Sequence, residues 1–433
     1  MTRSRGWPVL AAVLPVWLLA APAIQAQEQG DPKPPADEED RARGTFRWRR
    51  HPSLRFGRVL RVDFRAKLQF DFRDFTPAQR DHGEELFEIH RARVGVEGRF
   101  LNDFEYEVEY DLVQDKFPWR DAYVNYRRFR KAQIRAGKFK IPFGLEQLTG
   151  PANLDFALRT GLSRYLAPAR SIGAEVHGRF FSRGLNYQVG FFRHDGENAF
   201  DNDDKPTGQR TFAARLTGTP LRLLPLPGIL KSMEIGQAFT ESPVPEGLKG
   251  VEGRTAGRKT FFEHYFVRGH RMRLGSELRW APGPFSIQGE FVHVRDQRLG
   301  QAISGQDLPD LIARAWYVLG TWVVTGEKKA GGVEPRRAFL TERGVGAIEL
   351  AGRYEQLRFG SAQHPGRPTR STRGANLVSA SDRIWTVGLN WYLNPWTKVQ
   401  VNAIRDHLED RLRFPQEGRP NYWVKLLRLQ VVL

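Results

Sequence analysis

The chain of 433 residues contains no cysteine. This absence excludes a disulfide framework, a thiolate metal site and a cysteine nucleophile. The sequence also lacks a Gly-x-Ser-x-Gly nucleophile turn and a His-Glu-x-x-His zinc motif. Its ten histidines are scattered without the spacing of metal ligands. We therefore expect no catalytic residue, no metal site and no cofactor, and the protein is not expected to be an enzyme.

Long apolar runs are missing as well. Near the start, the basic residues Arg3 and Arg5 precede a short apolar stretch, 9–21, and small residues lead up to Ala26. This pattern is typical of a secretory signal peptide, which we place at residues 1–26. A membrane anchor is the poorer interpretation because the run is too short to span a bilayer. No later segment is apolar for long enough to form a transmembrane helix.

The residues after the predicted signal peptide form a polar stretch. Residues 27–57 contain three prolines at positions 32, 34 and 35 and an acidic run at 37–40. Such a composition is typical of segments that do not fold on their own. We interpret 27–57 as a flexible periplasmic N-terminal segment and expect the folded domain at 58–433.

Strict alternation of apolar and polar residues begins in this domain. In residues 60–73 every even position is apolar and every odd position is polar. Similar alternation recurs at 104–112, 272–280, 385–392 and 427–433. A period of two places each set on one face of a β-strand.

A soluble β-sandwich also alternates, with its apolar face turned inward. The length of the alternating segments argues against it, because strands in globular proteins usually run about five or six residues, whereas tilted membrane strands run about ten. In lipid, only a closed barrel satisfies the backbone hydrogen bonds of strands. The sequence thus predicts an all-β fold, a transmembrane antiparallel β-barrel with sixteen candidate strands.

The connections between these strands alternate between tight turns and long polar loops, as in outer-membrane barrels. The longest irregular stretch in the first half, 144–171, would be the third extracellular loop, and we expect it to fold inward and narrow the pore. Two connections, 219–231 and 326–345, are too long for the side of the tight turns, and the sequence offers no account of them.

The charge of the chain is strongly basic, at +18. Loss of Arg3 and Arg5 with the signal peptide would leave +16 (18 − 2). This balance indicates a polyanionic partner, which is a nucleic acid, a membrane surface or small anions. Because an exported protein rarely meets nucleic acid, we expect small anions and no nucleic acid.

The polar face of the strands supplies the candidate anion pathway. A lumen lined by guanidinium groups, which stay charged and offer a planar fork to anions, would attract anions and repel cations. The candidates are Arg61, Arg65, Lys67, Arg73, Arg91, Arg93, Arg99 and Arg135. The same face carries acids such as Glu97 and Glu109, so the alternative that these bases form structural ion pairs stays open.

The long loop carries the candidate anion-binding residues Arg159, Arg164 and Arg170. Inside the pore their charges would act strongly, because water is scarce there. The alternative is that the loop covers the mouth and its arginines are solvated. Other predicted outer loops are basic too, at 254–259 and 367–373, and would either funnel anions or bind the phosphates of lipopolysaccharide.

Five segments resemble signatures of the phosphate-selective porin O and P family of Gram-negative outer-membrane porins. They are GKFKIPFG at 137–144, RSIGAEVHG at 170–178, TGE at 325–327, GAIELAGRY at 346–354 and GLNWYLNP at 388–395. The resemblance implies a sixteen-stranded, often trimeric barrel in the outer membrane that passes phosphate or related anions. It also implies pore-narrowing basic residues in the third extracellular loop, here Arg159 and Arg170.

The leading prediction is an anion-selective diffusion channel of the Gram-negative outer membrane, for phosphate or polyphosphate. Its expected partners are inorganic phosphate or other small anions, outer-membrane lipid and lipopolysaccharide, and two further copies in a homotrimer. Two alternatives stay open: a general, weakly selective porin whose arginines are mostly paired, and a structural or surface barrel plugged by its own loop.

Overall fold

The computed structural model describes residues 45–48, 51–57, 59–76, 87–181, 184–200, 205–339, 343–410 and 419–433. These residues all belong to one compact unit, 43–433. The predicted signal peptide, 1–26, and most of the predicted flexible segment, 27–57, lie outside the described residues. Within the described ranges, no helix is long and apolar enough to cross a bilayer.

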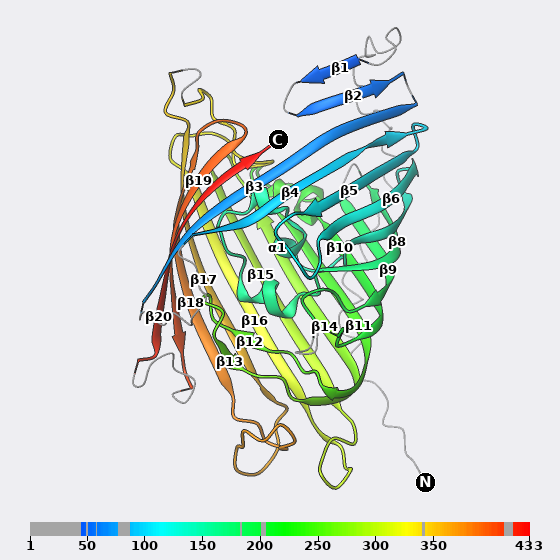
Figure 1. Ribbon diagram of the computed structural model, residues 1–433, viewed down its shortest axis with the longest axis vertical. Coiled ribbons are helices and arrows are strands. Elements are labelled where there is room, and N and C mark those ends of the chain that lie inside the picture. The colour runs from blue at the N-terminus through cyan, green and yellow to red at the C-terminus, as the bar shows by residue number, and fades with distance from the viewer. Residues whose placement is uncertain are drawn as a thin grey trace. The chain divides into compact units, whose positions relative to one another are not determined.

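Sixteen antiparallel strands form a closed barrel, in which each strand pairs with the next along the chain and β20 pairs with β3 (Figure 1). These strands are β3 (Leu60–Thr76), β4 (Phe87–Phe100), β5 (Phe104–Asp111), β6 (Trp119–Phe129), β7 (Ala132–Lys140), β8 (Arg170–Phe180), β9 (Leu185–His194), β10 (Gln209–Gly218), β11 (Glu234–Leu248), β14 (Phe266–Trp280), β15 (Phe285–Arg298), β16 (Leu308–Val323), β17 (Ala347–Ser361), β18 (Ala380–Tyr392), β19 (Thr397–Leu408) and β20 (Asn421–Val432). The predicted fold class is confirmed.

The alternation along each strand follows the inside and the outside of the barrel. On β3 the apolar side chains of Phe64 and Phe72 are 40% and 51% exposed, whereas Asp63 and Asp71 are buried. On β18 the same pattern exposes Trp385 and Val387. An exposed apolar face and a polar interior are the reverse of a soluble core, and they are what a barrel surrounded by lipid requires.

The connections divide between two rims. One rim has the short turns 101–103, 130–131, 281–284 and 393–396, and the other has the longer loops. The two connections that the sequence left unexplained, 219–233 and 324–346 in the structure, both lie on the rim of the turns.

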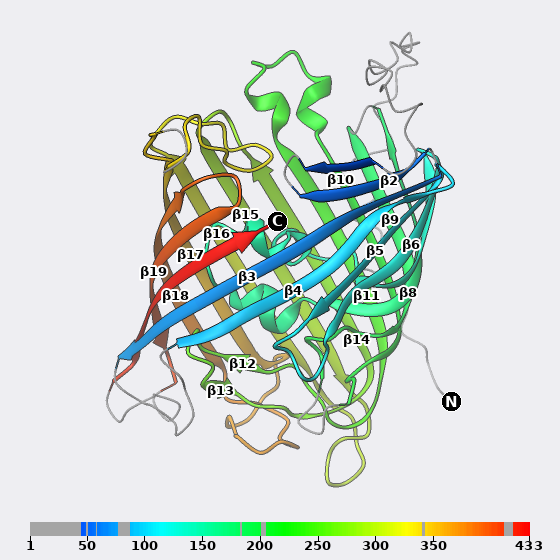
Figure 2. The same ribbon diagram turned by 45° about the horizontal axis from the view of Figure 1, so that its top comes forward.

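The first of these connections contains two short helical segments, η4 (Pro220–Leu223) and η5 (Leu230–Ser232), which Figure 2 shows rising near β10. The indole N–H of Trp280, on β14, donates to the carbonyl of Ile229 at 2.8 Å. Leu223 and Ile229 are exposed. This connection therefore stays outside the lumen.

A short hairpin precedes the barrel. It consists of β1 (Thr45–Trp48) and β2 (Pro52–Phe56), and β2 pairs with the first residues of β3. The rest of β3, from Lys67 to Thr76, pairs with β20. The hairpin thus continues the wall beyond the end of β20. It falls within the segment 27–57, for which the sequence predicted a flexible chain.

A hydrophobic core lies inside the barrel, on the side of β14 to β20. Inward-facing side chains such as Leu311, Leu357 and Ile404 pack there against two loops, residues 141–169 and 249–265. We call these the first and the second inward loop. From the alternation we expected only polar residues on the lumen side of the strands. This half of the lumen has apolar side chains instead, because the loops cover it and exclude water.

Candidate functional site

The first inward loop turns into the barrel directly after β7. Gly144 has a φ of 78°, a left-handed conformation that glycine adopts readily, and the short helix α1 (Leu145–Leu148) begins at the next residue. The backbone N–H groups of Leu145 and Glu146 both donate to the carboxylate of Glu290 on β15, at 2.7 Å. Figure 1 shows α1 within the barrel. The inward fold predicted for this loop is confirmed.

Polar side chains of the far wall hold the rest of this loop, which also contains η2 (Pro151–Asn153) and η3 (Leu162–Leu166). The backbone N–H of Ala157 donates to Asn402 of β19 at 2.8 Å. Arg353 of β17 donates to the carbonyl of Leu158 at 3.0 Å, and Arg428 of β20 donates to that of Ala157 at 2.5 Å. Much of the polar lumen face is thus a scaffold for the loop.

The connection 324–346 reaches the same loop from the other rim. Lys329 bonds to Asp155 of the first inward loop and, at 2.5 Å, to Glu349 of β17. Burial lowers the pKa of Lys329, but the two carboxylates outweigh this effect and raise the pKa above its ordinary value. This ion-pair cluster accounts for part of a connection that the sequence could not explain.

The second inward loop was not predicted, because the sequence analysis placed its basic residues outside the pore. It contains β12 (Gly253–Arg254) and β13 (Thr260–Phe262), a small hairpin. The backbone N–H of Ala256 donates to Asp406 of β19 at 2.8 Å. Phe262 packs against Phe359 of β17, with ring centroids 4.9 Å apart.

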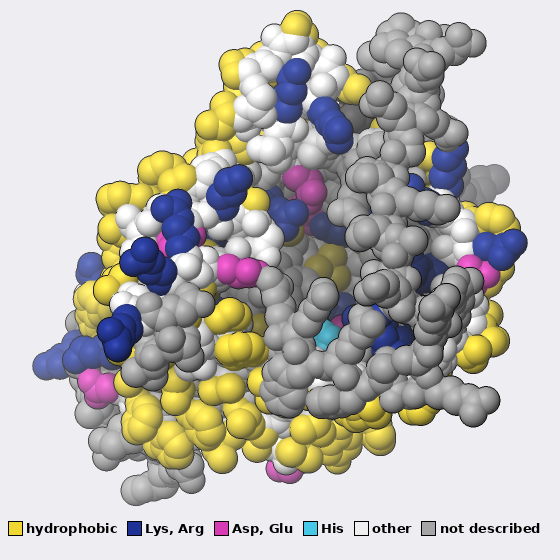
Figure 3. Space-filling view, turned by 90° about the horizontal axis from the view of Figure 1, so that it is seen from above, with side chains coloured by type: hydrophobic (Ala, Val, Ile, Leu, Met, Phe, Trp, Pro, Cys, Tyr) yellow, Lys and Arg dark blue, Asp and Glu magenta, His cyan; other side chains and the backbone are white. Residues whose placement is uncertain are grey.

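Two neighbouring cavities in the lumen, among the described residues, have volumes of about 290 and 170 Å³. Figure 3 views the barrel from above and shows basic side chains in its central hollow and apolar side chains around the outer wall. Three residues line both cavities: Arg91, Arg159 and Arg164. The other basic residues that line one or the other are Arg73, Arg93, Arg120, Lys140, Arg170 and Arg258. Among the described residues, Glu88 is the one acid in either lining.

Most of the predicted lumen residues form ion pairs. The pairs are Arg61 with Asp63 (2.8 Å), Arg65 with Glu97 (3.2 Å), Lys67 with Glu109, Arg73 with Asp71 (2.9 Å), Arg93 with Asp111 (2.7 Å), Arg99 with Glu105 (3.4 Å) and Arg135 with Glu175 (3.5 Å). These bases are partly neutralised, as the alternative interpretation of the sequence expected.

Arg170 is the first residue of β8 rather than part of the loop. It is buried, and its guanidinium donates to both carboxylate oxygens of Asp121, at 3.2 Å to Oδ1 and 2.5 Å to Oδ2. A bidentate pair of this kind leaves little of the guanidinium for an anion.

Arg91, Arg159 and Arg164 have no carboxylate within ion-pair distance among the described residues. Arg91 donates to the side-chain oxygen of Gln69 at 2.6 Å. Arg159 donates to backbone carbonyls of its own loop, among them that of Thr149 at 2.6 Å. Arg164 lies over the ring of Tyr165, at 5.0 Å from its centroid. All three side chains are half-buried.

The guanidinium of Arg159 keeps its charge at neutral pH. Burial lowers the pKa of Arg159 to about 10, against the opposing effect of Glu146, and a guanidinium with that pKa is still protonated at pH 7. Bound carbonyl and amide oxygens do not cancel a positive charge. The space between the two cavities is therefore electropositive.

Four basic lining residues were not among the predicted site residues: His90, Arg120, Lys140 and Arg258. His90 is the extra residue of a bulge in β4, opposite Gln69 and Phe70, which turns both His90 and Arg91 inward. Strict alternation would send one of two neighbouring residues to the lipid, so no pattern in the sequence predicts that His90 faces the lumen. Arg258 reaches the lumen because its loop folds inward.

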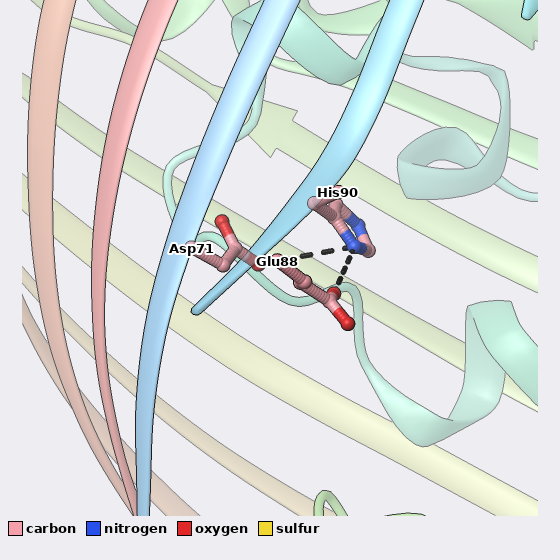
Figure 4. Close-up of side chains that lie close together, drawn as sticks. All are labelled: Asp71, Glu88 and His90. Carbon is pink, nitrogen blue, oxygen red and sulfur yellow. Dashed lines mark hydrogen bonds and ion pairs between the residues drawn. The ribbon is translucent and has the colours of Figure 1, made fainter. Parts of the chain in front are cut away.

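His90 belongs to a cluster with Asp71 and Glu88, in which one ligand atom from each lies within 4.8 Å of the others (Figure 4). His90 Nδ1 lies 2.9 Å from Glu88. Arg428 bonds to both carboxylate oxygens of Asp71, at 2.6 and 2.7 Å, and Arg73 pairs with Asp71 and Glu88. Because guanidinium groups already occupy the acids, this cluster is a network of ion pairs and not a favourable site for a cation.

A closed barrel of sixteen strands, apolar outside and narrowed by an inward loop, is the architecture of an outer-membrane porin. The family model of the phosphate-selective porin O and P family matches residues 62–431. The chain belongs to this family. It is a β-barrel channel of the Gram-negative outer membrane rather than an enzyme.

Known proteins agree with this assignment. The chain is 22% identical to Porin O of Pseudomonas aeruginosa over 383 residues, which cover 78% of this chain and 81% of that protein. Its fold is similar to that of the outer-membrane channel DcaP of Acinetobacter baumannii, at 9% identity and a TM-score of 0.55, over 87% of this chain and 98% of DcaP. The anion-selective porin from Comamonas acidovorans also has a similar fold, at 10% identity and a TM-score of 0.53, over 86% of this chain and 99% of that porin.

Proposed function

We propose that this porin selects for anions and that Arg91, Arg159 and Arg164 are the residues that bind them. One observation carries the proposal: the lining residues shared by the two cavities are these three arginines, and no carboxylate pairs with them in the described part of the chain. An anion that passes between the cavities would meet charges that nothing else neutralises.

The proposed substrate is phosphate, polyphosphate or another small anion. Guanidinium groups suit such ligands because their planar fork of donors matches the oxygens of phosphate and carboxylate. The family to which the chain belongs is described as phosphate-selective, and one solved barrel of similar fold is an anion-selective porin. Arg170 and the paired lumen bases would add to the field without binding the ion directly.

A second candidate function is a general porin with weak selectivity. The ion pairs of the other lumen bases favour it, because a paired guanidinium attracts anions poorly. A plugged surface barrel is a third candidate, favoured by the two loops inside the lumen. Electrical measurements distinguish the three, since they differ in conductance and in selectivity.

The test is the current through the purified protein in a planar bilayer under a gradient of potassium chloride. We expect a reversal potential whose sign shows that chloride permeates better than potassium. We also expect added phosphate to block the chloride current. In the double variant Arg159→Gln/Arg164→Gln the concentration of phosphate needed for half-block should rise by about tenfold or more, since a hydrogen bond to a charged group contributes about 1.5–3 kcal/mol.

Arg65→Gln is the matched control, because Arg65 lies on the lumen face but pairs with Glu97 at 3.2 Å and lines neither cavity. Its half-blocking concentration should stay near that of the unaltered protein. Near-zero selectivity of the unaltered protein would favour the general porin, and absence of conductance would favour the plugged barrel.

We further propose that the channel assembles as a trimer and that its basic outer loop 367–373 contacts lipopolysaccharide. One solved form of OmpT from Vibrio cholerae, whose fold is similar to that of this chain at a TM-score of 0.53, is a trimer. We also propose that residues 1–26 are removed on export.

A further inference from the structure

The two cavities differ in their walls. The smaller one is lined mainly by basic and polar residues, with Pro151 and Ala169 as its apolar members. The larger one also has a wall of apolar side chains. Its apolar members are Phe75, Leu154, Ala157, Leu158, Ala256 and Val424.

This apolar wall departs from the alternation that governs the barrel. Phe75 of β3 and Val424 of β20 pair across the sheet and take positions on the inner face, where the alternation places polar residues. Phe75 and Leu158 are half-buried beside the internal core, so each keeps an apolar surface that faces the cavity. A bare inorganic anion, which stays hydrated, gains nothing from such a surface.

The size of the larger cavity also favours a ligand larger than an inorganic anion. A volume of about 290 Å³ holds about ten water-sized groups at about 30 Å³ each. Inorganic phosphate has five non-hydrogen atoms and fills only part of this space. Sites for small organic ligands typically combine an apolar wall with a few charged groups that fix the orientation of the ligand.

We propose that the larger cavity binds small organic anions, with the charged head on Arg91, Arg159 and Arg164 and a compact apolar body, such as an aromatic ring, against Phe75 and Leu158. This inference rests on the proposed anion-binding role of the three arginines and extends it from inorganic phosphate to organic phosphonates, phosphate esters and carboxylates. The smaller cavity, which lacks an apolar wall, would accept the charged head as the ligand moves on.

The experiment compares two probes with the same anionic head, methylphosphonate and phenylphosphonate. The full-length protein is placed in a planar bilayer, and each probe is added at the same pH and ionic strength while the chloride current is recorded. Partial burial of the ring should make phenylphosphonate block at a concentration about tenfold lower than methylphosphonate, at about 25 cal/mol for each Å² of apolar surface buried.

Two variants test the wall separately, Phe75→Gln on β3 and Leu158→Gln on the first inward loop. In each, the ratio of the two half-blocking concentrations should fall from about ten towards one. If one variant does not fold, the other still tests the wall, because they lie on different elements. Leu223→Gln, at an 81% exposed leucine outside the lumen, is the control and should keep the ratio.

The outcomes separate this inference from the proposed function. Equal block by both probes, with anion selectivity intact, overturns the apolar site and leaves the three arginines as the anion site. An unchanged ratio in both wall variants also overturns it. Absence of block by either probe, together with absence of anion selectivity, overturns the proposed function itself.

Discussion

Whether an arginine in the lumen is able to meet an ion depends on the carboxylates around it. Arg93 pairs with Glu109 at 3.1 Å and Asp111 at 2.7 Å, so its charge is largely neutralised. Arg91, two residues away on the same strand, contacts only the neutral side chain of Gln69 in this way. At the scale of the residue, selectivity should depend on the few unpaired arginines and little on the total number of arginines in the lumen.

The buried ion pairs that hold the middle of the first inward loop, at Asp155, should matter for stability. In Lys329→Met, Asp155 and Glu349 lose the cation that both contact. Removal of one partner of a buried pair typically lowers the free energy of unfolding by about 3–5 kcal/mol, because the remaining charge stays buried. We expect a loss of this order, measured by denaturant-induced unfolding of the barrel in detergent micelles.

The double variant Lys329→Met/Asp155→Asn should recover part of that loss, since it also removes one of the stranded charges. Lys425→Met is the control, because Lys425 pairs with Asp74 at 3.2 Å where both side chains are more than half exposed. A loss as large in Lys425→Met as in Lys329→Met would contradict the role given to burial.

At the scale of the element, the first inward loop is held by Glu290. This carboxylate accepts from the backbone N–H groups of Leu145 and Glu146 and from the hydroxyl of Tyr317 at 2.6 Å. A helix as short as α1 has little stability of its own. Its position inside the barrel therefore depends on the wall residues that bind it.

Glu290→Ala should release α1 from β15. Each lost hydrogen bond typically contributes about 0.5–1.5 kcal/mol, so the loop should leave its inward position part of the time. We expect a larger and more variable single-channel conductance and a weaker block by phosphate, measured in planar bilayers.

The control for this prediction is Glu97→Ala, at a lumen-facing acid that pairs with Arg65 and, within the described part of the chain, makes no bond to the loop. Its conductance should change little. Identical single-channel traces from Glu290→Ala and the unaltered protein would show that Glu290 does not hold the loop in place.

The strands were more predictable than the loops. The alternation in 60–73 predicts β3 because lipid on one side and the lumen on the other impose a period of two on every residue. His90 escaped this pattern because a bulge inserts one residue and reverses the faces locally. The alternation did not predict the second inward loop, because the position of this loop depends on contacts with Asp406 and Phe359, which lie far away in the sequence.

At the scale of the whole molecule, the internal core shifts the open pathway to one side of the barrel. The two inward loops pack against β14 to β20, and the cavities lie beside the basic residues of β3, β4, β6, β7 and β8. An anion would thus pass through an electropositive channel formed by the first strands and by the exposed side of the loops.

This arrangement predicts a selectivity that depends on salt. The Debye length falls from about 10 Å at 0.1 M to about 3 Å at 1 M ionic strength, so salt should screen the lumen charges. We expect the ratio of anion to cation permeability, measured by reversal potentials, to decline over this range.

In the double variant Arg159→Gln/Arg164→Gln, the ratio of anion to cation permeability should be lower at low salt. It should also decline less as the salt concentration rises. A ratio that is equally high at both ionic strengths would point to selection by size and shape rather than by charge.

The sequence by itself determined the barrel, because each strand reports locally which of its faces meets lipid, and it determined which residues are basic. Only the tertiary structure decided which of those bases carry a free charge. Arg93 is paired with an acid of the neighbouring strand β5 and Arg170 with an acid of β6, two strands away, whereas Arg91, Arg159 and Arg164 are not paired with acids. Pairing of this kind depends on strand register and on the fold of the loops, neither of which a local pattern records.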